Sequence, residues 1–232
     1  QDYLRDESRR AGRAEFIAFP ETEEAIVETL RAAARDGLPA TIQGARTGIT
    51  AGAAPSGGLI INLSRMKRIT GLRYDAERGH FFVRVQPGAL LSELRAALHD
   101  RAFDEAGWDS ASLKALDLLK KSPAVFLPPD PTEATASIGG MIACNASGAR
   151  TFLYGPTRRY VYELKIILAG GGTLRLQRGT ARAEGRRFRL ATAQGERYEG
   201  ELPSYAMPRV KSAAGYFAED NMDLIDLFIG SE

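Results

Sequence analysis

Cysteine, histidine and long apolar runs are scarce in this chain of 232 residues. The single cysteine rules out an internal disulfide and fits a reducing compartment. The two histidines, the cysteine and the carboxylates form no cluster with metal-ligand spacing, so we expect no bound metal. No apolar run approaches the roughly 20 residues that cross a bilayer, so we expect no membrane span.

The chain also lacks a strong charge of either sign. Its formal net charge is +2 and its arginines are spread along the sequence, so we expect no nucleic-acid partner. The basic run of residues 178–189 is predicted to be a solvated hairpin or loop. A hydrophobic content of 44% with 26% charged residues is ordinary for a globular protein that buries a substantial core.

Glycine, proline and small hydroxyl residues are concentrated in two tracts. The first is TIQGARTGITAGAAPSGG, residues 41–58, and the second is PPDPTEATASIGGMIACNASGARTFLYG, residues 128–155. Glycine lets the backbone approach a ligand closely, and Ser, Thr and Asn supply directed hydrogen bonds. Because the tracts lie far apart in the sequence, they predict one long ligand held between two lobes.

Hydrophobic periodicity and capping residues predict a mixture of helices and strands. The predicted helices cover residues 22–36, 90–100, 112–120 and 137–146, and the predicted strands cover residues 38–43, 59–63, 81–86, 161–169, 173–177 and 187–191. A helix between strands predicts a βαβ-like first lobe, and the strand-rich end predicts an antiparallel sheet in a second lobe. Ile138, Met141 and Ile142 are predicted to be ordinary helix core.

The two tracts resemble the FAD-binding domain of the vanillyl-alcohol-oxidase-type flavoproteins. The similarity is strongest to the FAD-linked oxidase branch, which includes glycolate oxidase flavin subunits and D-lactate dehydrogenases. Residues 41–58, followed by a strand and LSRM at residues 63–66, resemble the pyrophosphate loop of that family. The second tract resembles its PPDPT…SIGGMIA…NASGAR run, and residues 211–232 resemble a third family motif. The matches follow the family order across residues 16–232.

This resemblance implies an α+β fold, a two-lobed domain with FAD bound non-covalently in the cleft between the lobes. We expect an N-terminal extension over residues 1–15, a first FAD-binding lobe over 16–100, a crossover or insertion over 101–124, and a second lobe over 125–232. The chain ends within the third motif, so we expect a fragment that lacks the C-terminal substrate domain of the family.

The candidate cofactor-binding residues come from both tracts and from one turn between them. Successive backbone N–H groups of a glycine-rich turn converge on the oxyanions of a pyrophosphate. The G-x-G-x-x-G spacing of a Rossmann site is absent. The first tract contributes Gln43, Gly44, Ala45, Arg46, Thr47 and Gly48, the turn contributes Pro87 and Gly88, and the second tract contributes Pro129, Asp130, Ser137, Gly139, Gly140, Asn145, Ser147 and Gly148.

These second-tract residues have separate expected roles. Pro129 and Asp130 form a rigid segment at the adenosine side, because Asp130 lies between two prolines. Ser137 begins a helix whose free N–H groups are expected to face the cofactor. The resemblance places Asn145, Ser147 and Gly148 near the ribityl chain and the flavin ring.

An arginine, Arg46, stands where the family usually has glycine. Arginine does not adopt a positive φ cheaply, so we expect a right-handed or extended backbone there. Two interpretations of its side chain stay open: the guanidinium adds charge at a phosphate or the flavin edge, or it points to solvent.

Four further residues are interpreted more simply. Cys144 is predicted to be a buried, inert thiol. His80 and His99 lie outside both tracts, which argues against a histidyl-flavin bond. Lys211 and Tyr216 either border the flavin or belong to a structural turn.

The resemblance implies an oxidoreductase that transfers hydride from a small D-2-hydroxy acid, such as lactate or glycolate, to FAD. Electrons then leave to an acceptor protein or quinone. The catalytic residues are unknown, because in the family they come mostly from the C-terminal domain. We expect a cytoplasmic protein, or one held at a membrane surface by its acceptor. The alternatives are a same-fold oxidoreductase with another substrate, such as a sugar or an alkyl-ether lipid, and a non-catalytic assembly subunit.

Overall fold

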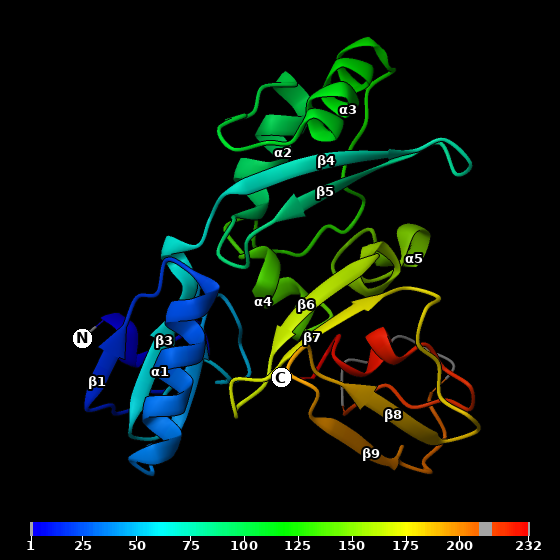
Figure 1. Ribbon diagram of the computed structural model, residues 1–232. Helices are drawn as coiled ribbons and strands as arrows, with labels where there is room; N and C mark the ends of the chain where they lie inside the picture. Colours follow the sequence, from blue (N-terminus) through cyan, green and yellow to red (C-terminus); the bar gives the residue numbers. More distant parts are fainter. Residues whose placement is uncertain (1, 209–214, 232) are drawn as a thin grey trace.

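The computed structural model describes residues 2–208 and 215–231, and its first unit is a parallel sheet covered by one helix (Figure 1). Strand β3 (Leu59–Asn62) lies between β1 (Phe16–Ala18) and β2 (Ala40–Gln43). Helix α1 (Glu23–Arg35) packs its buried Ile26, Leu30 and Ala33 against Leu59 and Ile61 of the central strand. The predicted βαβ-like arrangement is confirmed.

Helix α1 begins and ends where the sequence predicts. The Thr22 hydroxyl accepts a hydrogen bond from the Ala25 N–H at 3.2 Å, which caps the first turn. Gly37 follows the helix with φ +64°, a conformation that glycine adopts without a steric penalty.

The second unit is an antiparallel hairpin packed against two helices. Its strands are β4 (Ile69–Asp75) and β5 (His80–Val85), and its helices are α2 (Leu91–Asp100) and α3 (Ser110–Lys121). Trp108 lies in the shared core and donates a hydrogen bond from Nε1 to the Ile69 carbonyl at 3.0 Å. Part of the expected crossover, residues 101–124, therefore belongs to this core, while the domain boundaries themselves stay a prediction.

The third unit holds two short helices and two separate hairpins. The helices are α4 (Ile138–Ala143) and α5 (Thr151–Tyr154), and the strands are β6 (Glu163–Ile167), β7 (Thr173–Gln177), β8 (Arg187–Ala191) and β9 (Arg197–Glu201). β6 pairs with β7 and β8 with β9, both antiparallel, so the predicted antiparallel pairing is confirmed, although it forms two separate two-stranded sheets. The sequence missed β1, β4, β9 and α5, and it extended α4 by several residues. Four short 3-10 helices complete the described structure: Asp2–Leu4, Leu63–Arg65, Thr157–Tyr160 and Leu224–Leu227.

Helix α4 connects the cores of these units, and in Figure 1 it lies near the centre of the molecule. Ile138 packs against the cluster of the second unit, and Ile142 packs against the cluster that contains β6 to β8. Met141 is 2% exposed beside Leu91. The prediction that Ile138, Met141 and Ile142 are helix core is confirmed.

An aromatic and cationic contact joins the β4–β5 hairpin to the third unit. The rings of Phe82 and Tyr162 lie 4.5 Å apart between centroids. The Arg73 guanidinium lies 4.8 Å from the first ring and 4.5 Å from the second. A guanidinium over an aromatic face is attracted by the ring quadrupole, so this cluster stabilises the contact between strands that are distant in sequence.

An ionic cluster anchors the C-terminal segment to the third unit. Arg178 donates two hydrogen bonds to the Asp226 carboxylate, both at 2.9 Å, and Arg158 donates a third at 3.2 Å. Burial lowers the pKa of Arg158, whereas the hydrogen bonds with Asp226 raise the pKa of Arg178. Arg178 was expected in a solvated hairpin or loop, and for this residue the expectation is wrong.

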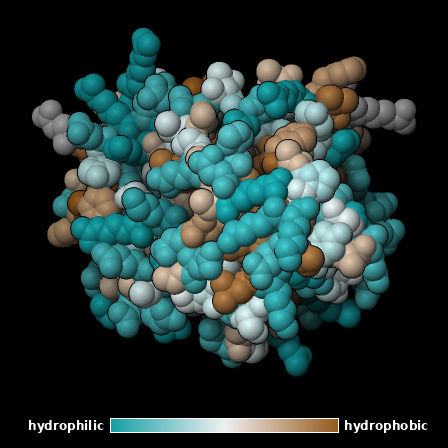
Figure 2. All heavy atoms as spheres, turned by 90° about the horizontal axis from the view of Figure 1, so that it is seen from above, coloured by the Kyte–Doolittle hydropathy of each residue, from teal (hydrophilic) through white to brown (hydrophobic). Residues whose placement is uncertain are grey.

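The surface agrees with the balanced composition. Seen from above, it is mostly hydrophilic, with small and separate apolar spots (Figure 2). Within the described residues, no helix has the length and apolar character to span a bilayer.

We predict that Asp226→Ala destabilises the fold. The change leaves the positive charge of Arg158, whose side chain is 15% exposed, without its carboxylate partner. Removing one partner of such a pair costs about 3 kcal/mol. Urea unfolding of the protein without cofactor measures this loss.

Glu199→Ala is the matched control, because the Arg189–Glu199 pair is exposed, with side chains 71% and 66% accessible. Its expected loss is about 0.5 kcal/mol or less. Equal losses for the two variants would contradict the anchoring role of Asp226.

Candidate functional site

The two glycine tracts meet at the start of α4. The Ser137 hydroxyl accepts hydrogen bonds from Gly140 N–H and from Ala45 N–H, each at 3.3 Å. One side chain thus caps the helix and fixes the loop that links β2 to β3, residues 44–58, which we call the glycine loop. A Cβ on Gly44 would overlap the Ser137 hydroxyl. Gly44 is therefore needed for the close approach of the two tracts.

The turn at Pro87 and Gly88 completes this junction. Gly139 N–H donates to the Pro87 carbonyl and Ile138 N–H to the Ala89 carbonyl, both at 2.8 Å. A Cβ on Gly139 would come 2.8 Å from Cβ of Pro87, and one on Gly88 would overlap the Leu63 carbonyl. The candidate residues of the turn and of α4 therefore hold each other in place.

These bonds use the donors at the start of α4. The N–H groups of Ile138 and Gly139 donate to the turn, and that of Gly140 donates to the Ser137 cap. The expectation that this helix start presents free N–H groups to a cofactor is wrong, because carbonyls of the chain itself and the capping hydroxyl have taken them.

The middle of the glycine loop, in contrast, has unpaired donors. The backbone N–H groups of residues 46–52 have no hydrogen-bond partner within residues 2–208 and 215–231, and the first four of them belong to Arg46, Thr47, Gly48 and Ile49. A Cβ added to Gly48 would meet no atom within 4 Å, so the backbone faces open space there. Successive unpaired N–H groups beside open space are available to an anion.

Asp130 lies in an arginine-lined part of the second tract. Arg95 Nη2 donates to its carboxylate at 2.7 Å and to the Pro129 carbonyl at 2.9 Å, and Arg150 Nε lies 3.2 Å from the other oxygen. A Cβ on Gly148 would overlap the Asp130 carbonyl. Arg95 and Arg150 thus compensate the negative charge of Asp130, and these contacts make the segment at Pro129 and Asp130 a rigid corner.

Asn145 is a buried polar residue with an unusual backbone. It is 7% exposed and has φ +47°. Its Oδ1 accepts from Arg158 N–H at 3.0 Å, which leaves Nδ2 for a ligand. Asparagine tolerates the left-handed region better than most residues, so the position is typical of a functional side chain held in a fixed direction. Ser147, two residues on, has no side-chain hydrogen bond among the described residues.

Gln43 supports the glycine loop from below. Its side chain is fully buried and donates from Nε2 to the carbonyls of Tyr3, at 2.8 Å, and Ala53, at 2.7 Å. Its Oε1 accepts from Asn62 at 3.2 Å. The side chain of this candidate residue is therefore used within the protein.

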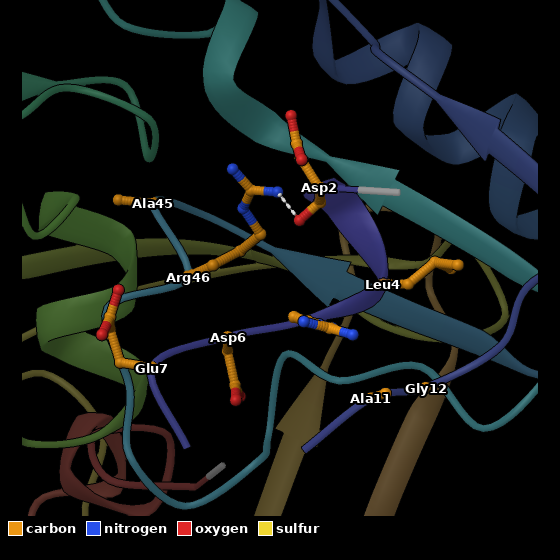
Figure 3. A pocket seen from close by; sticks show the side chains of 9 residues that line it. Asp2, Leu4, Asp6, Glu7, Ala11, Gly12, Ala45 and Arg46 are labelled. Atoms are coloured by element: carbon orange, nitrogen blue, oxygen red, sulfur yellow. Dashed lines mark hydrogen bonds between the residues drawn. The ribbon is translucent and has the colours of Figure 1, made fainter. Parts of the chain in front are cut away.

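The backbone of Arg46 differs from the expectation, while the role of its guanidinium at a phosphate or the flavin edge stays a prediction. Its φ is +61°, so the expected right-handed or extended backbone is wrong. Its guanidinium donates to the Asp2 carbonyl (Figure 3). It also lies 4.5 Å from the Tyr3 ring centroid. The side chain points toward the N-terminal segment.

Residues 2–13 cover one side of the glycine loop and enclose a cavity of about 490 Å³ with it (Figure 3). Asp6 and Glu7 line this cavity opposite Ala45 and Arg46. The sequence analysis assigned these residues to an extension and missed them. The one sequence feature that points to this segment is an aspartate followed two residues later by a serine, Asp6 and Ser8. This pattern is too common in turns to identify a site.

The remaining candidates lie away from this junction or outside the described part. Tyr216 is 51% exposed, and its carbonyl accepts from the Tyr205 hydroxyl. Lys211 lies outside the described residues. Cys144 is half-buried at the end of α4.

We predict that Gly44→Ala and Gly48→Ala differ in the protein without cofactor. At position 44 the new methyl displaces either the loop or the Ser137 cap, which costs about 1–2 kcal/mol. At position 48 the methyl enters open space. Urea unfolding should show the loss only for Gly44→Ala, and an unchanged stability of that variant would contradict the packed junction.

The comparisons with known proteins agree with this geometry. The family model described as "FAD binding domain" matches residues 14–112 and 110–177. A D-lactate dehydrogenase of Anaerostipes hadrus is 32% identical over 179 residues, which cover 76% of this chain and 32% of that protein. A D-lactate dehydrogenase of Archaeoglobus fulgidus is 31% identical, with coverages of 70% and 31%. The glycolate oxidase subunit GlcD of Bacillus subtilis is 29% identical, with coverages of 68% and 29%.

Solved structures show the same fold at low sequence identity. A xylooligosaccharide oxidase from Myceliophthora thermophila has a TM-score of 0.52 at 18% identity and covers 75% of this chain and 32% of its own. A 6-hydroxy-D-nicotine oxidase from Arthrobacter nicotinovorans has a TM-score of 0.55 at 14% identity, with coverages of 75% and 32%. The chain spans about a third of the length of these relatives. The predicted vanillyl-alcohol-oxidase-type fold is thus confirmed, and the chain belongs to the FAD binding domain family, with FAD as its cofactor.

Proposed function

We propose that the glycine loop binds the pyrophosphate of FAD. The observation that supports this best is the run of four unpaired N–H groups from Arg46 to Ile49 beside the open space at Gly48. Pyrophosphate oxygens accept hydrogen bonds from such a run, and charge-assisted bonds are the stronger ones. The Thr47 hydroxyl is a further donor.

The other candidate residues act on either side of this loop. One group keeps the loop, the turn and α4 in contact, and it thereby positions the donors of the loop. It consists of Gln43, Gly44, Ala45, Pro87, Gly88, Ser137, Gly139 and Gly140. Asn145 and Ser147 present polar groups to the ribityl chain and flavin, and Gly148 keeps them close to the corner at Asp130 and Pro129. When bound, FAD supplies the flavin that accepts a hydride.

In our proposal FAD is held non-covalently. Neither histidine lies in the glycine tracts: His80 begins β5, and His99 is exposed on α2 beside Asp100. The bonds that we assign to the cofactor are hydrogen bonds from backbone N–H groups and short polar side chains. Denaturation therefore releases the flavin.

We propose an oxidoreductase that acts on a small D-2-hydroxy acid, such as lactate or glycolate. Three of the similar proteins are named D-lactate dehydrogenase or glycolate oxidase subunit. The substrate carboxylate and hydroxyl contact a further, C-terminal domain, in line with the greater length of those relatives. An acceptor protein or a quinone takes the electrons, and the protein is cytoplasmic or held at a membrane surface by that acceptor.

We predict that the purified chain binds FAD in preference to FMN, because the four loop donors need the pyrophosphate that FMN lacks. Flavin fluorescence titration measures both affinities. After acid precipitation the flavin should be in the supernatant, and flavin that stays with the protein pellet would contradict the non-covalent proposal. A chain that ignores both flavins would support the assembly-subunit alternative.

We predict that Gly48→Ala weakens FAD binding about tenfold or more, because its methyl occupies the space beside the loop donors and disturbs at least one charge-assisted hydrogen bond. Its φ lies outside the left-handed region, so the backbone itself tolerates alanine. Gly170→Ala is the control, since it also meets open space but lies outside both tracts. Equal FAD affinity of Gly48→Ala and wild type would place the phosphates elsewhere.

We predict that the FAD-loaded chain stays oxidised when D-lactate or glycolate is added without oxygen. The groups that orient the substrate are assigned to the further domain, so the hydride donor is not held against the flavin. A longer chain that includes this domain should be reduced under the same conditions, as followed by absorbance of the flavin. Rapid bleaching of the 232-residue chain would show that it already holds a complete active site.

A further inference from the structure

The glycine loop contains two residues whose backbone needs outside support. Arg46 has φ +61° and Ala51 has φ +66°. Residues other than glycine adopt this left-handed conformation at an energetic cost, because their Cβ crowds the following carbonyl. Contacts from another part of the chain must therefore hold the loop in this shape.

Residues 2–13 make those contacts, and we call this segment the N-terminal brace. On one side of the loop, Glu7 N–H donates to the Arg46 carbonyl at 3.2 Å, and the Arg46 guanidinium lies over the Tyr3 ring, 4.5 Å from its centroid. On the other side, Ala53 N–H donates to Asp6 Oδ2 at 3.3 Å. The brace thus contacts the loop at its first left-handed residue and again just after the second.

Asp6 is the centre of the brace. Its Oδ1 accepts from Ser8 N–H at 3.0 Å and from the Ser8 hydroxyl, which fixes a tight turn. Asp6 is 8% exposed, and among the described residues no cation pairs with it. The hydrogen bonds from these neutral donors compensate the burial of the carboxylate, and they hold the brace and the loop together.

The far end of the brace is pinned to the end of the glycine loop. Arg13 N–H donates to the Pro55 carbonyl at 3.0 Å, and Gly57 N–H donates to the Arg13 carbonyl at 2.7 Å. A Cβ on Gly12 would overlap the Pro55 carbonyl. The brace is therefore hydrogen-bonded to both ends of the loop.

We propose that the N-terminal brace positions the glycine loop for FAD, with Asp6 and Tyr3 as positioning residues. The inference rests on the proposed function of the loop. The backbone angles of Arg46 set the direction of the next N–H groups along the chain, so a loop that relaxes at Arg46 changes where its donors point. The brace contributes to FAD affinity without touching the cofactor.

Asp6→Ala tests this inference in the full chain. FAD affinity should fall about tenfold, because the loop loses a hydrogen bond to a charged acceptor and its fixed shape. Amide hydrogen exchange at Ala53 should rise, while exchange in α1 (Glu23–Arg35) should stay as in the wild type. Asp6→Asn keeps one acceptor oxygen and turns an NH2 group toward the other set of donors, so it should restore the affinity only in part.

Asp2→Ala is the matched control, because Asp2 contacts Arg46 through its backbone carbonyl, which alanine retains. It should bind FAD like the wild type. Asp6→Ala with unchanged affinity would overturn the proposal, and so would a loss of exchange protection in α1 equal to that at Ala53. If Asp6→Ala does not fold, Tyr3→Leu decides: its FAD affinity should fall about threefold through the lost cation–π contact, and an unchanged affinity overturns the proposal.

A wild-type chain that does not bind FAD would refute the proposed function of the loop and leave the brace to be judged separately. Exchange at Ala53 in wild type and Asp6→Ala then shows by itself whether Asp6 holds the loop. Faster exchange in the variant supports the positioning role, and equal exchange overturns it.

Discussion

The contact between the Ser137 hydroxyl and the glycine loop is the constraint on which the site depends. The hydroxyl accepts from Gly140 N–H within the helix start and from Ala45 N–H, and this second bond joins segments that are 92 residues apart. The absence of a side chain at Gly44 makes room for that hydroxyl. Helix α4 also packs Ile138 and Ile142 into two different cores, so a shift at Ser137 would disturb the packing of both cores.

Hydrogen-bond donors divide the site into two kinds of backbone. Around α4 the donors bond to the chain itself, and this part gives rigidity. Along residues 46–49 the donors are unpaired within the described part of the chain, and this part is available to a ligand. The same glycine-rich composition therefore serves packing in one tract and ligand approach in the other.

Much of the fold follows from local sequence signals, whereas the site depends on long-range contacts. Thr22 and Gly37 define α1 because capping acts over a few residues. The sequence did not predict β4, because this strand is stabilised by pairing with β5 and by the hydrogen bond from Trp108, and its own residues carry no clear strand pattern. Composition alone identifies the two tracts. The left-handed backbone of Arg46 and the role of Asp6, in contrast, depend on contacts between residues about 40 positions apart, such as the hydrogen bond from Ala53 N–H to Asp6, and no local sequence pattern predicts such contacts.

The hydrogen bonds at the start of α4 bear on whether the chain folds before or after it binds FAD. Since Pro87, Ala89 and Ser137 already accept from its N–H groups, this helix start needs no cofactor, and the unpaired donors of the glycine loop can bond to water in the meantime. We therefore expect the chain to fold first and to take up FAD afterwards.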